Sequence, residues 1–414
     1  MQQSNAKKAD IADIQHLVAF GYMFLCCLNQ YVKVAGIPVF IFLILIYSFL
    51  KLLRNGFVIR NSFSNIIKSS RWVLNFFSCW ILYGLFFAAI IWNEAGWRNV
   101  LYIAINSLGF YNAFVDSYND EKVRVSLIRG IICGLCANML VAVWELQTGR
   151  HVMSLTSDYL RRFANVPLGF YVNTNDLAIV LIFFLVAVTV SYIYNRPNNH
   201  LKLAVVGLII GGCFIVFSTG SLISRATIIS LILFSYLFYQ FKKRRKNGFI
   251  ILIITTFFLL IVLIVDNGNV FNVLSIRIDD PAFTLRGDLW SKTLDVFKST
   301  YCIGIGPGQN SVVGVGSVHN LLLEIVSEYG FIIGFIFSIL YALIFRTIIG
   351  LNNSLITNIG FSLCLLMIPM SICSSSMTKL FPIWPCIGLI LSFVILDSER
   401  REKNDYNGCA NLSN

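Results

Sequence analysis

The chain has 414 residues, of which 57% are hydrophobic and only 13% are charged, and its formal net charge is +12. Its mean hydropathy of +0.75 lies above the range of soluble domains, so the composition excludes an ordinary soluble fold and indicates a polytopic membrane protein. Lipid offers the backbone no hydrogen-bond partners, and the apolar runs have the length of helices. We therefore expect an all-α bundle that forms one membrane domain, residues 1–414.

About twelve apolar segments are long enough to cross a bilayer as helices. They are residues 17–32, 36–53, 72–92, 99–115, 125–145, 176–194, 201–219, 226–241, 248–265, 330–349, 355–374 and 380–397. Residues 1–16 are polar and lack the pattern of a cleaved signal peptide, so the first segment is expected to remain as an anchor.

Most of the basic residues lie on one side of the membrane when the predicted spans are traced in order. If the N-terminus is cytoplasmic, most Lys and Arg residues fall in segments that face the cytoplasm, as the positive-inside rule requires. Both termini then lie inside, including a tail at residues 398–414. The run Lys242-Lys-Arg-Arg-Lys246 continues directly into a span, which favours a membrane anchor, so no nucleic-acid partner is expected.

Two outer segments hold most of the remaining basic residues. The first outer loop, residues 146–175, contains Arg150, Arg161 and Arg162, and the second, residues 266–329, is the longest polar interval of the chain. Positive charge beside the outer membrane surface suits an anionic, lipid-borne ligand. The sequence has no acidic cluster or His pair at metal-ligand spacing, so we expect neither a metal ion nor another cofactor.

Arg225 follows the turn Ser218-Thr-Gly-Ser221 between two spans. An arginine at the edge of the bilayer is costly unless a cavity or an anion compensates it, although it can also extend toward lipid headgroups. The small residues beside it would let a phosphate approach backbone N–H groups, which favours a functional role.

The second outer loop contains Arg286 and, one helical turn later, Trp290. The pattern of residues around them predicts a short amphipathic helix along the outer surface, whose simplest role is to cover the bundle. Because a guanidinium group binds phosphate oxygens in pairs, Arg286 and Arg225 together would form a pyrophosphate clamp that requires no metal ion.

The run Gly304-Ile-Gly-Pro-Gly308 lacks the Lys-Ser/Thr ending of a phosphate loop and is consistent with a simple turn. His319 lies shortly downstream. On a helix, Asn320 and Glu324 would lie one turn apart, whereas His319 and Glu324 would not share a face. A lone histidine is more often structural than catalytic, but this one lies near two outer arginines and titrates near neutral pH. We therefore interpret His319 as a general base.

Polar and aromatic groups of both outer loops are suited to sugar hydroxyls and ring faces. Asn175 and Asp176 begin a span, where either would also serve as a helix N-cap. The candidate substrate-binding residues are Arg150, Arg161, Arg162, Asn175, Trp290, Asn320 and Glu324.

These motifs occur in a characteristic order along residues 140–340. The order is Asn175-Asp176-Leu-Ala, Ser224-Arg225-Ala226, Arg286 with Trp290, Gly304-x-Gly-x-Gly308, His319-Asn320-x-x-x-Glu324 and Glu328-x-Gly330-x-x-x-Gly334. It resembles the O-antigen ligase and O-antigen polymerase superfamily, which includes Wzy-type polymerases of bacterial surface polysaccharides.

The resemblance implies a metal-independent, inverting glycosyltransferase in the bacterial cytoplasmic (inner) membrane. Such an enzyme takes a glycan from an undecaprenyl-pyrophosphate-linked donor on the outer face. Arg225 and Arg286 would hold the pyrophosphate, and His319 would deprotonate or orient the hydroxyl of the glycan acceptor. The implied partners are this donor, the acceptor and membrane lipid, and a chain-length regulator protein is a further candidate.

Three functions stay open. The motifs are shared by polymerases, which extend O-antigen or capsular polysaccharide, and by ligases, which transfer the glycan to a lipid A core or another acceptor. The short tail favours a polymerase. A lipid-linked oligosaccharide transporter is the alternative of another class, but transporters usually show internal repeats and polar residues near mid-bilayer, whereas the polar residues here concentrate in outer loops.

Overall fold

The computed structural model describes residues 2–54, 68–153, 166–195, 199–243, 281–314, 318–371, 374 and 376–412. Its helices and strands are α1 Gln2–Cys27, β1 Lys33–Val34, β2 Ile37–Pro38, α2 Val39–Arg54, α3 Lys68–Ile91, α4 Glu94–Asn119, α5 Glu121–Thr148, α7 Thr174–Asn195, α8 Asn199–Ser218, α9 Leu222–Lys243, α12 Pro281–Ser299, η2 Gln309–Ser311, α13 Leu321–Gly350, α14 Leu355–Ser371, η3 Met377–Lys379 and α15 Ile383–Leu412.

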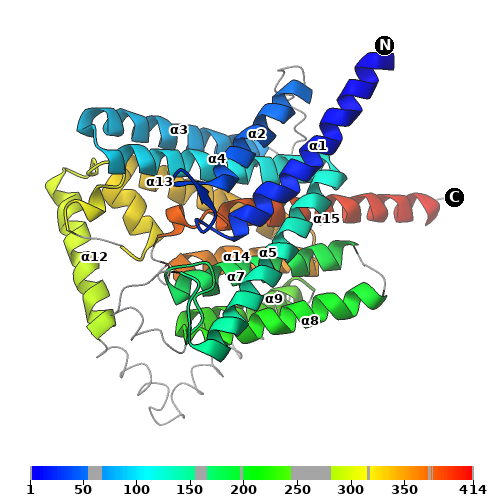
Figure 1. Cartoon of the computed structure of the whole chain (residues 1–414). Coiled ribbons are helices and arrows are strands. Elements are labelled where there is room, and N and C mark those ends of the chain that lie inside the picture. Colours follow the sequence, from blue (N-terminus) through cyan, green and yellow to red (C-terminus); the bar gives the residue numbers. More distant parts are fainter. Residues whose placement is uncertain are drawn as a thin grey trace, which may run out of the picture.

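The described part of the chain is a bundle of helices (Figure 1), as its composition predicts. Its described strands form one short antiparallel hairpin, in which Lys33 pairs with Pro38. Each predicted span overlaps a described helix except residues 248–265, which fall outside the described residues, and several helix ends differ from the predicted ones by a few residues. In the described ranges, α3, α5, α7 and α13 are long and apolar enough to cross a membrane. The chain is a multi-pass, all-α membrane protein.

α7 occupies the interior of the bundle (Figure 1) and packs against α5, α8, α14 and α15. Its side chains from Leu177 to Val188 are all buried. A helix that is apolar on every side suits either a buried position or contact with lipid, and α7 is buried among neighbouring helices. Its first turn therefore stands on a rigid element in the middle of the molecule.

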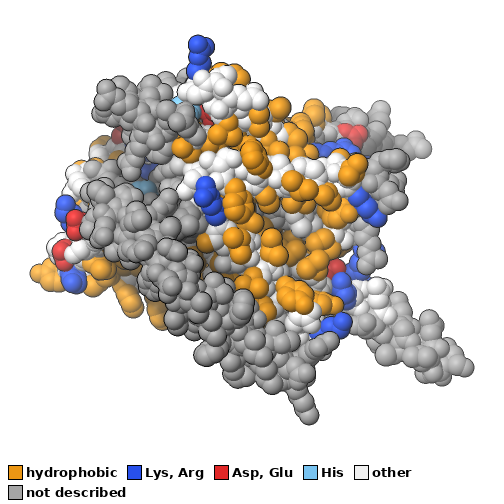
Figure 2. All heavy atoms as spheres, turned by 90° about the horizontal axis from the view of Figure 1, so that it is seen from below, with side chains coloured by type: hydrophobic (Ala, Val, Ile, Leu, Met, Phe, Trp, Pro, Cys, Tyr) orange, Lys and Arg blue, Asp and Glu red, His pale blue; other side chains and the backbone are white. Residues whose placement is uncertain are grey.

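The outer surface of the bundle is apolar in the way that contact with lipid requires. α8 exposes Leu203, Val206, Ile210 and Phe214 at a spacing of three or four residues, which is one face of a helix. Figure 2 shows a broad field of hydrophobic side chains on one face, with most of the Lys and Arg side chains toward its edges. Exposed apolar surface of this extent marks a membrane-contacting face.

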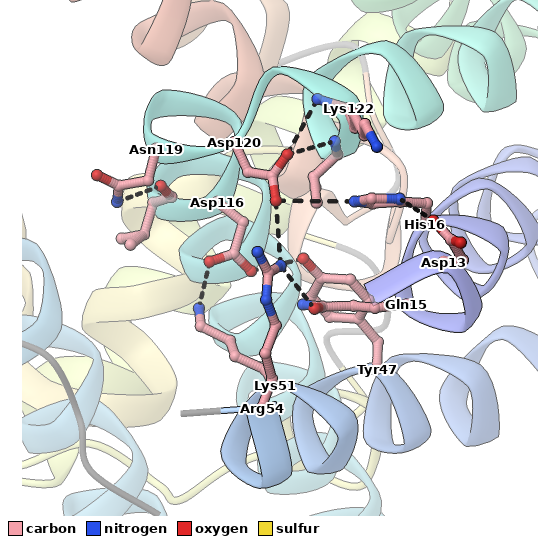
Figure 3. Close-up of polar contacts among 12 residues, drawn as sticks. Asp13, Gln15, His16, Tyr47, Lys51, Arg54, Asp116, Asn119, Asp120 and Lys122 are labelled. Atoms are coloured by element: carbon pink, nitrogen blue, oxygen red, sulfur yellow. Dashed lines mark hydrogen bonds and ion pairs between the residues drawn. The ribbon is translucent and has the colours of Figure 1, made fainter. Parts of the chain in front are cut away.

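One end of the bundle carries paired charges. Asp116 of α4 accepts a hydrogen bond from the Tyr47 hydroxyl at 2.6 Å and lies 2.6 Å from the Lys51 ammonium, both from α2 (Figure 3). The Asp116 side chain is largely buried. A buried charge is tolerable only when it is paired and hydrogen-bonded, and here both conditions hold.

A second carboxylate at this end joins four helices. Asp120 links α4 and α5, and its Oδ1 accepts the N–H groups of Lys122 and Val123, which caps α5. Its Oδ2 lies 3.1 Å from Arg54 Nη1 of α2 and 3.7 Å from His16 Nε2 of α1 (Figure 3). Burial raises the pKa of Asp120, but the bonds from Arg54 and Val123, with the nearby positive charge, outweigh burial and hold that pKa below its usual value.

We predict that Asp120→Asn weakens the bundle through charge alone, because asparagine still caps a helix. A carboxyl group whose pKa is lowered by folding stabilises the protein above its usual pKa, and this contribution disappears as the pH falls through the lowered value. At pH 7 the variant should lose about 1 kcal/mol of unfolding free energy. Thermal unfolding in detergent at pH 7 and below pH 4 measures the effect.

The matched control is Asp295→Asn, which removes an exposed carboxylate 3.9 Å from Lys298 on α12 and should leave stability unchanged. A difference between wild type and Asp120→Asn that grows as the pH falls would contradict the prediction.

Candidate functional site

His319 lies at the start of α13 in an unusual backbone conformation. Its φ angle is 51°, in the left-handed region that residues other than glycine and asparagine rarely adopt. Asn320 follows as the N-cap, and its Oδ1 accepts the N–H groups of Leu322 and Leu323. Tyr301 and Cys302 also have positive φ angles, so this conformation alone does not assign a function, and the role of His319 as a base stays a prediction.

A hydrogen bond joins α12 to the residue immediately before His319. The indole N–H of Trp290 donates to the Val318 carbonyl at 2.9 Å. The sequence predicts an amphipathic helix here, and α12 confirms the helix, with Thr293 buried and Leu294 exposed. Arg286 stands on α12 one turn before Trp290, and its side chain lies outside the described part. α12 runs along the side of the bundle opposite the end of α15 (Figure 1).

The imidazole ring of His319 is bound by a segment that the sequence analysis did not single out. His319 Nδ1 lies 2.9 Å from the carbonyl oxygen of Ser374. The Ser374 hydroxyl in turn donates to Asp176 Oδ1, in the first turn of α7, at 3.1 Å. Both Ser374 and Asp176 are buried. These two contacts, through Ser374, connect the start of α13 to α7.

The same segment binds Glu324. The carboxylate of Glu324, 6% exposed, accepts hydrogen bonds from the hydroxyls of Ser376 at 2.5 Å and Thr378 at 2.7 Å. The carbonyl of Thr378 accepts from the Asn106 amide of α4 at 2.6 Å. Glu324 therefore holds Ser376 and Thr378 in place, and its described contacts are internal to the protein.

Glu328, one turn further along α13, organises the glycine-containing loop. Its Oε2 accepts the Asn99 amide and the Gly308 N–H, each at 2.8 Å. The backbone carbonyls of Ser327 and Glu328 accept the N–H groups of Ile305 and Gly306 at 2.9 Å. The loop from Gly304 to Gly308 is therefore engaged with α13, and the glycines serve this contact.

The contact depends on close backbone approach. Gly330 has φ 76° and ψ 177°, which breaks the helical path of α13, and a Cβ there would overlap the Ile303 carbonyl oxygen. A Cβ at Gly304 would lie 2.5 Å from the Gly330 nitrogen. Only glycine fits at both positions. The turn interpretation of the glycine run is the one that these contacts support.

Arg225 lies at the start of α9, where its Nε and Nη2 donate to the Phe217 carbonyl of α8 at 3.0 and 2.5 Å. The Ser221 hydroxyl accepts the Ser224 N–H at the start of the same helix. The turn between α8 and α9 is joined to α7, because the Thr174 hydroxyl donates to the Thr219 carbonyl at 3.0 Å.

The first outer loop is held by Glu145, which the sequence analysis did not assign a role. Its buried carboxylate accepts the N–H groups of Leu168 and Gly169 at 2.6 and 2.7 Å. Arg150 is exposed just after α5, and no contact among the described residues joins it to His319. Arg161 and Arg162 lie outside the described residues.

α7 begins two residues earlier than a cap at Asn175 would allow. Its first residue is Thr174, and the Asn173 side chain accepts the Asn175 N–H at 2.9 Å. The expectation that Asn175 or Asp176 caps this helix is therefore wrong. Asp176 lies inside the first turn, where its carboxylate is directed to Ser374.

The contacts form one continuous path at one end of the bundle. It runs from the turn beside Arg225, through Thr174 and Asp176 of α7, to Ser374, His319 and α12. Sequence reasoning missed Ser374, Ser376 and Thr378. The available signal was a hydroxyl-rich run between two apolar segments on the predicted outer side.

Fold and site together define a polytopic helical membrane protein with a polar site at one end. Residues 203–339 match the family described as O-Antigen ligase, and this range includes Arg225, Arg286 and His319. The Teichuronic acid biosynthesis protein TuaE of Bacillus subtilis (strain 168) is 23% identical over 357 residues, which cover 78% of this chain and 71% of that protein. No solved structure matches the chain. The resemblance to the O-antigen ligase and polymerase superfamily is confirmed.

We predict that Gly330→Ala severely destabilises the protein, because the new methyl group meets a backbone carbonyl and the φ angle becomes strained. The expected loss is about 3 kcal/mol or more of unfolding free energy. Thermal unfolding and the yield of monodisperse protein in detergent measure it. The control is Gly207→Ala on α8, where a Cβ meets nothing within 4 Å and stability should be kept or slightly raised. Equal stability of the two variants would refute the prediction.

Proposed function

We propose that the protein polymerises undecaprenyl-pyrophosphate-linked oligosaccharide repeat units of a bacterial surface polysaccharide. The observation that carries the proposal is the arrangement around Arg225 and His319. Arg225 donates to a neutral carbonyl, and in the described ranges no carboxylate lies within ion-pair distance of it. Its positive charge is therefore available to an anionic ligand. His319 belongs to the same end of the bundle through the path of contacts across α7.

The proposed reaction is an inverting transfer. The acceptor hydroxyl oxygen attacks the anomeric carbon of the donor, the bond from that carbon to the pyrophosphate oxygen breaks, and undecaprenyl pyrophosphate leaves. The hydroxyl proton passes to His319. Pyrophosphate is a good leaving group, so the reaction needs charge stabilisation and a base more than an acid. The proposal assigns charge stabilisation to the guanidinium groups of Arg225 and Arg286.

The remaining candidate residues receive different roles within this proposal. Asn320 and Glu324 shape the surroundings of His319, because their described contacts are to α13 and to the hydroxyls of Ser376 and Thr378. Asn175 and Arg150 are assigned to the glycan. The positive-inside rule favours an orientation with this end outside the cytoplasmic membrane, because Lys51 and Arg54 lie at the other end.

Two alternatives remain for the experiment to decide. A ligase would use the same donor site with a lipid A core or another acceptor, and the family description favours it. A lipid-linked oligosaccharide transporter is the alternative of another class. The name of the TuaE relative, a biosynthesis protein, supports a synthetic role over transport.

We expect Arg225→Ala, Arg286→Ala and His319→Ala each to reduce glycan transfer at least 100-fold while the protein stays in the membrane. Lys292→Ala and Lys298→Ala, on the same helix as Arg286, also remove a positive charge and should retain activity. Turnover by purified variants, with membrane yield as a control, measures the effect. Retained activity in all three site variants would remove the proposed site.

A separate variant isolates the chemistry of His319 from its backbone. Asparagine tolerates a positive φ angle, so His319→Asn preserves the local fold better than alanine does. If His319 is a base, His319→Asn should lose turnover at every acceptor concentration. A loss confined to low acceptor concentration would assign His319 to binding instead.

The reaction itself is tested with purified protein in detergent and an undecaprenyl pyrophosphate oligosaccharide as the added substrate. A gel ladder in multiples of the repeat unit is expected for the polymerase. Transfer that appears only after addition of a lipid A core acceptor would establish the ligase. The absence of transfer in both assays, together with movement of the lipid in vesicles, would establish the transporter.

A further inference from the structure

The Nδ1 contact of His319 fixes which ring nitrogen can act as a base. A carbonyl oxygen has no proton to donate, so a 2.9 Å contact with the Ser374 carbonyl is favourable only when Nδ1 carries the hydrogen. The opposite tautomer would place two lone pairs against each other. In the neutral ring the unprotonated nitrogen is therefore Nε2, which is the nitrogen that would accept a proton.

The direction of the Ser374 carbonyl group must itself be fixed if it is to orient the His319 ring. Ser374 lies between the end of α14 at Ser371 and the start of η3 at Met377, outside any helix. Regular backbone hydrogen bonding therefore does not set the direction of its carbonyl. The hydroxyl of the same residue supplies a fixed point, because it donates to Asp176 Oδ1 at 3.1 Å.

Asp176 is well placed to act as that fixed point. It is 6% exposed, stands in the first turn of the buried helix α7, and is 198 residues from Ser374 in sequence. The neighbouring Thr174 joins the same turn to the Thr219 carbonyl. A carboxylate on the most enclosed helix of the bundle moves little, so it transmits a defined position to Ser374 and then to the imidazole ring.

We infer that Asp176 and Ser374 are positioning residues for His319: Asp176 holds the Ser374 hydroxyl, and the Ser374 carbonyl keeps the His319 proton on Nδ1 with the lone pair on Nε2. The inference rests on the proposed role of His319 as the base. It assigns a role to Asp176 that differs from the helix cap that its sequence position suggests. Neither residue contacts the reacting atoms in this assignment.

The tautomer can be measured without any substrate. The chain has four histidines, so ¹⁵N-histidine labelling gives few signals, and His319→Asn identifies the signals of His319 by their disappearance. In the wild-type protein we expect the neutral His319 ring to carry its hydrogen on Nδ1 and none on Nε2. Asp176→Ala and Ser374→Ala should each convert this into a mixture of both tautomers. Asp176→Asn should restore the wild-type signal, because its amide oxygen still accepts the Ser374 hydroxyl.

Turnover provides the second readout. Asp176→Ala and Ser374→Ala should lower kcat about 10- to 100-fold with little change in the KM for the acceptor, because a misoriented base affects the chemical step. The matched control is Ser362→Ala, which removes a hydroxyl that is equally buried and donates to a backbone carbonyl within α14. It should change neither the tautomer nor kcat.

The outcomes separate this inference from the proposed function. An unchanged tautomer in Asp176→Ala and Ser374→Ala overturns the inference, whatever their activity, and so does an equal change in Ser362→Ala. A changed tautomer with unchanged kcat also overturns it. These kcat comparisons apply if the wild-type protein transfers glycan. If it transfers none, the proposed function is refuted, and a changed tautomer in Asp176→Ala and Ser374→Ala still supports the orientation of the His319 ring by these two residues.

Discussion

The break of α13 at Gly330 is the constraint on which the site depends. In a regular helix the Ser327 carbonyl accepts the Phe331 N–H, but here Phe331 donates to the Cys302 carbonyl and Ser327 accepts the Ile305 N–H. An apolar bundle cannot leave such backbone groups unpaired. The loop from Cys302 to Gly308 supplies every one of these partners. The break and the loop therefore satisfy each other's backbone hydrogen bonds.

This pairing of the break and the loop also determines where the polar side chains point. The segment of α13 before Gly330 carries Glu324 and Glu328 one turn apart, and these two carboxylates bind two different loops. Glu328 holds the glycine loop, and Glu324 holds the segment with Ser376 and Thr378. His319 precedes this helical segment, so its position follows from how the segment is fixed at both sides.

The sequence was sufficient for the helices and for the order of the motifs. Apolar runs of membrane-spanning length leave the backbone few alternatives to a helix, so the predicted spans overlap described helices outside residues 248–265. The helix around Trp290 was predicted from its amphipathic pattern, and its contact to Val318 was not. His319 was singled out as a candidate base from its type and its place near two arginines, and this role stays a prediction. These features depend on local composition, which a sequence displays directly.

The contacts of the site could not be predicted in the same way. Ser374 meets Asp176 across 198 residues and His319 across 55, and a serine near the end of an apolar run has many other partners available. Which hydroxyl meets which carboxylate is decided by how the helices pack. The helix cap shows the same limit on a smaller scale. It lies at Asn173, three residues before Asp176, so Asp176 is inside the helix and binds Ser374.

The two polar ends of the bundle compensate their carboxylates by different means. At one end Lys51 faces Asp116 and Arg54 faces Asp120, so positive and negative charges cancel within the protein. At the other end the carboxylates of Asp176, Glu324 and Glu328 bind hydroxyl, amide and backbone N–H groups, all of which are neutral. Neutral donors can satisfy the hydrogen bonds of a buried carboxylate without an ion pair to a Lys or Arg side chain. In the proposed function the guanidinium of Arg225 at this end binds the donor pyrophosphate, whose oxygens can accept paired hydrogen bonds from a guanidinium.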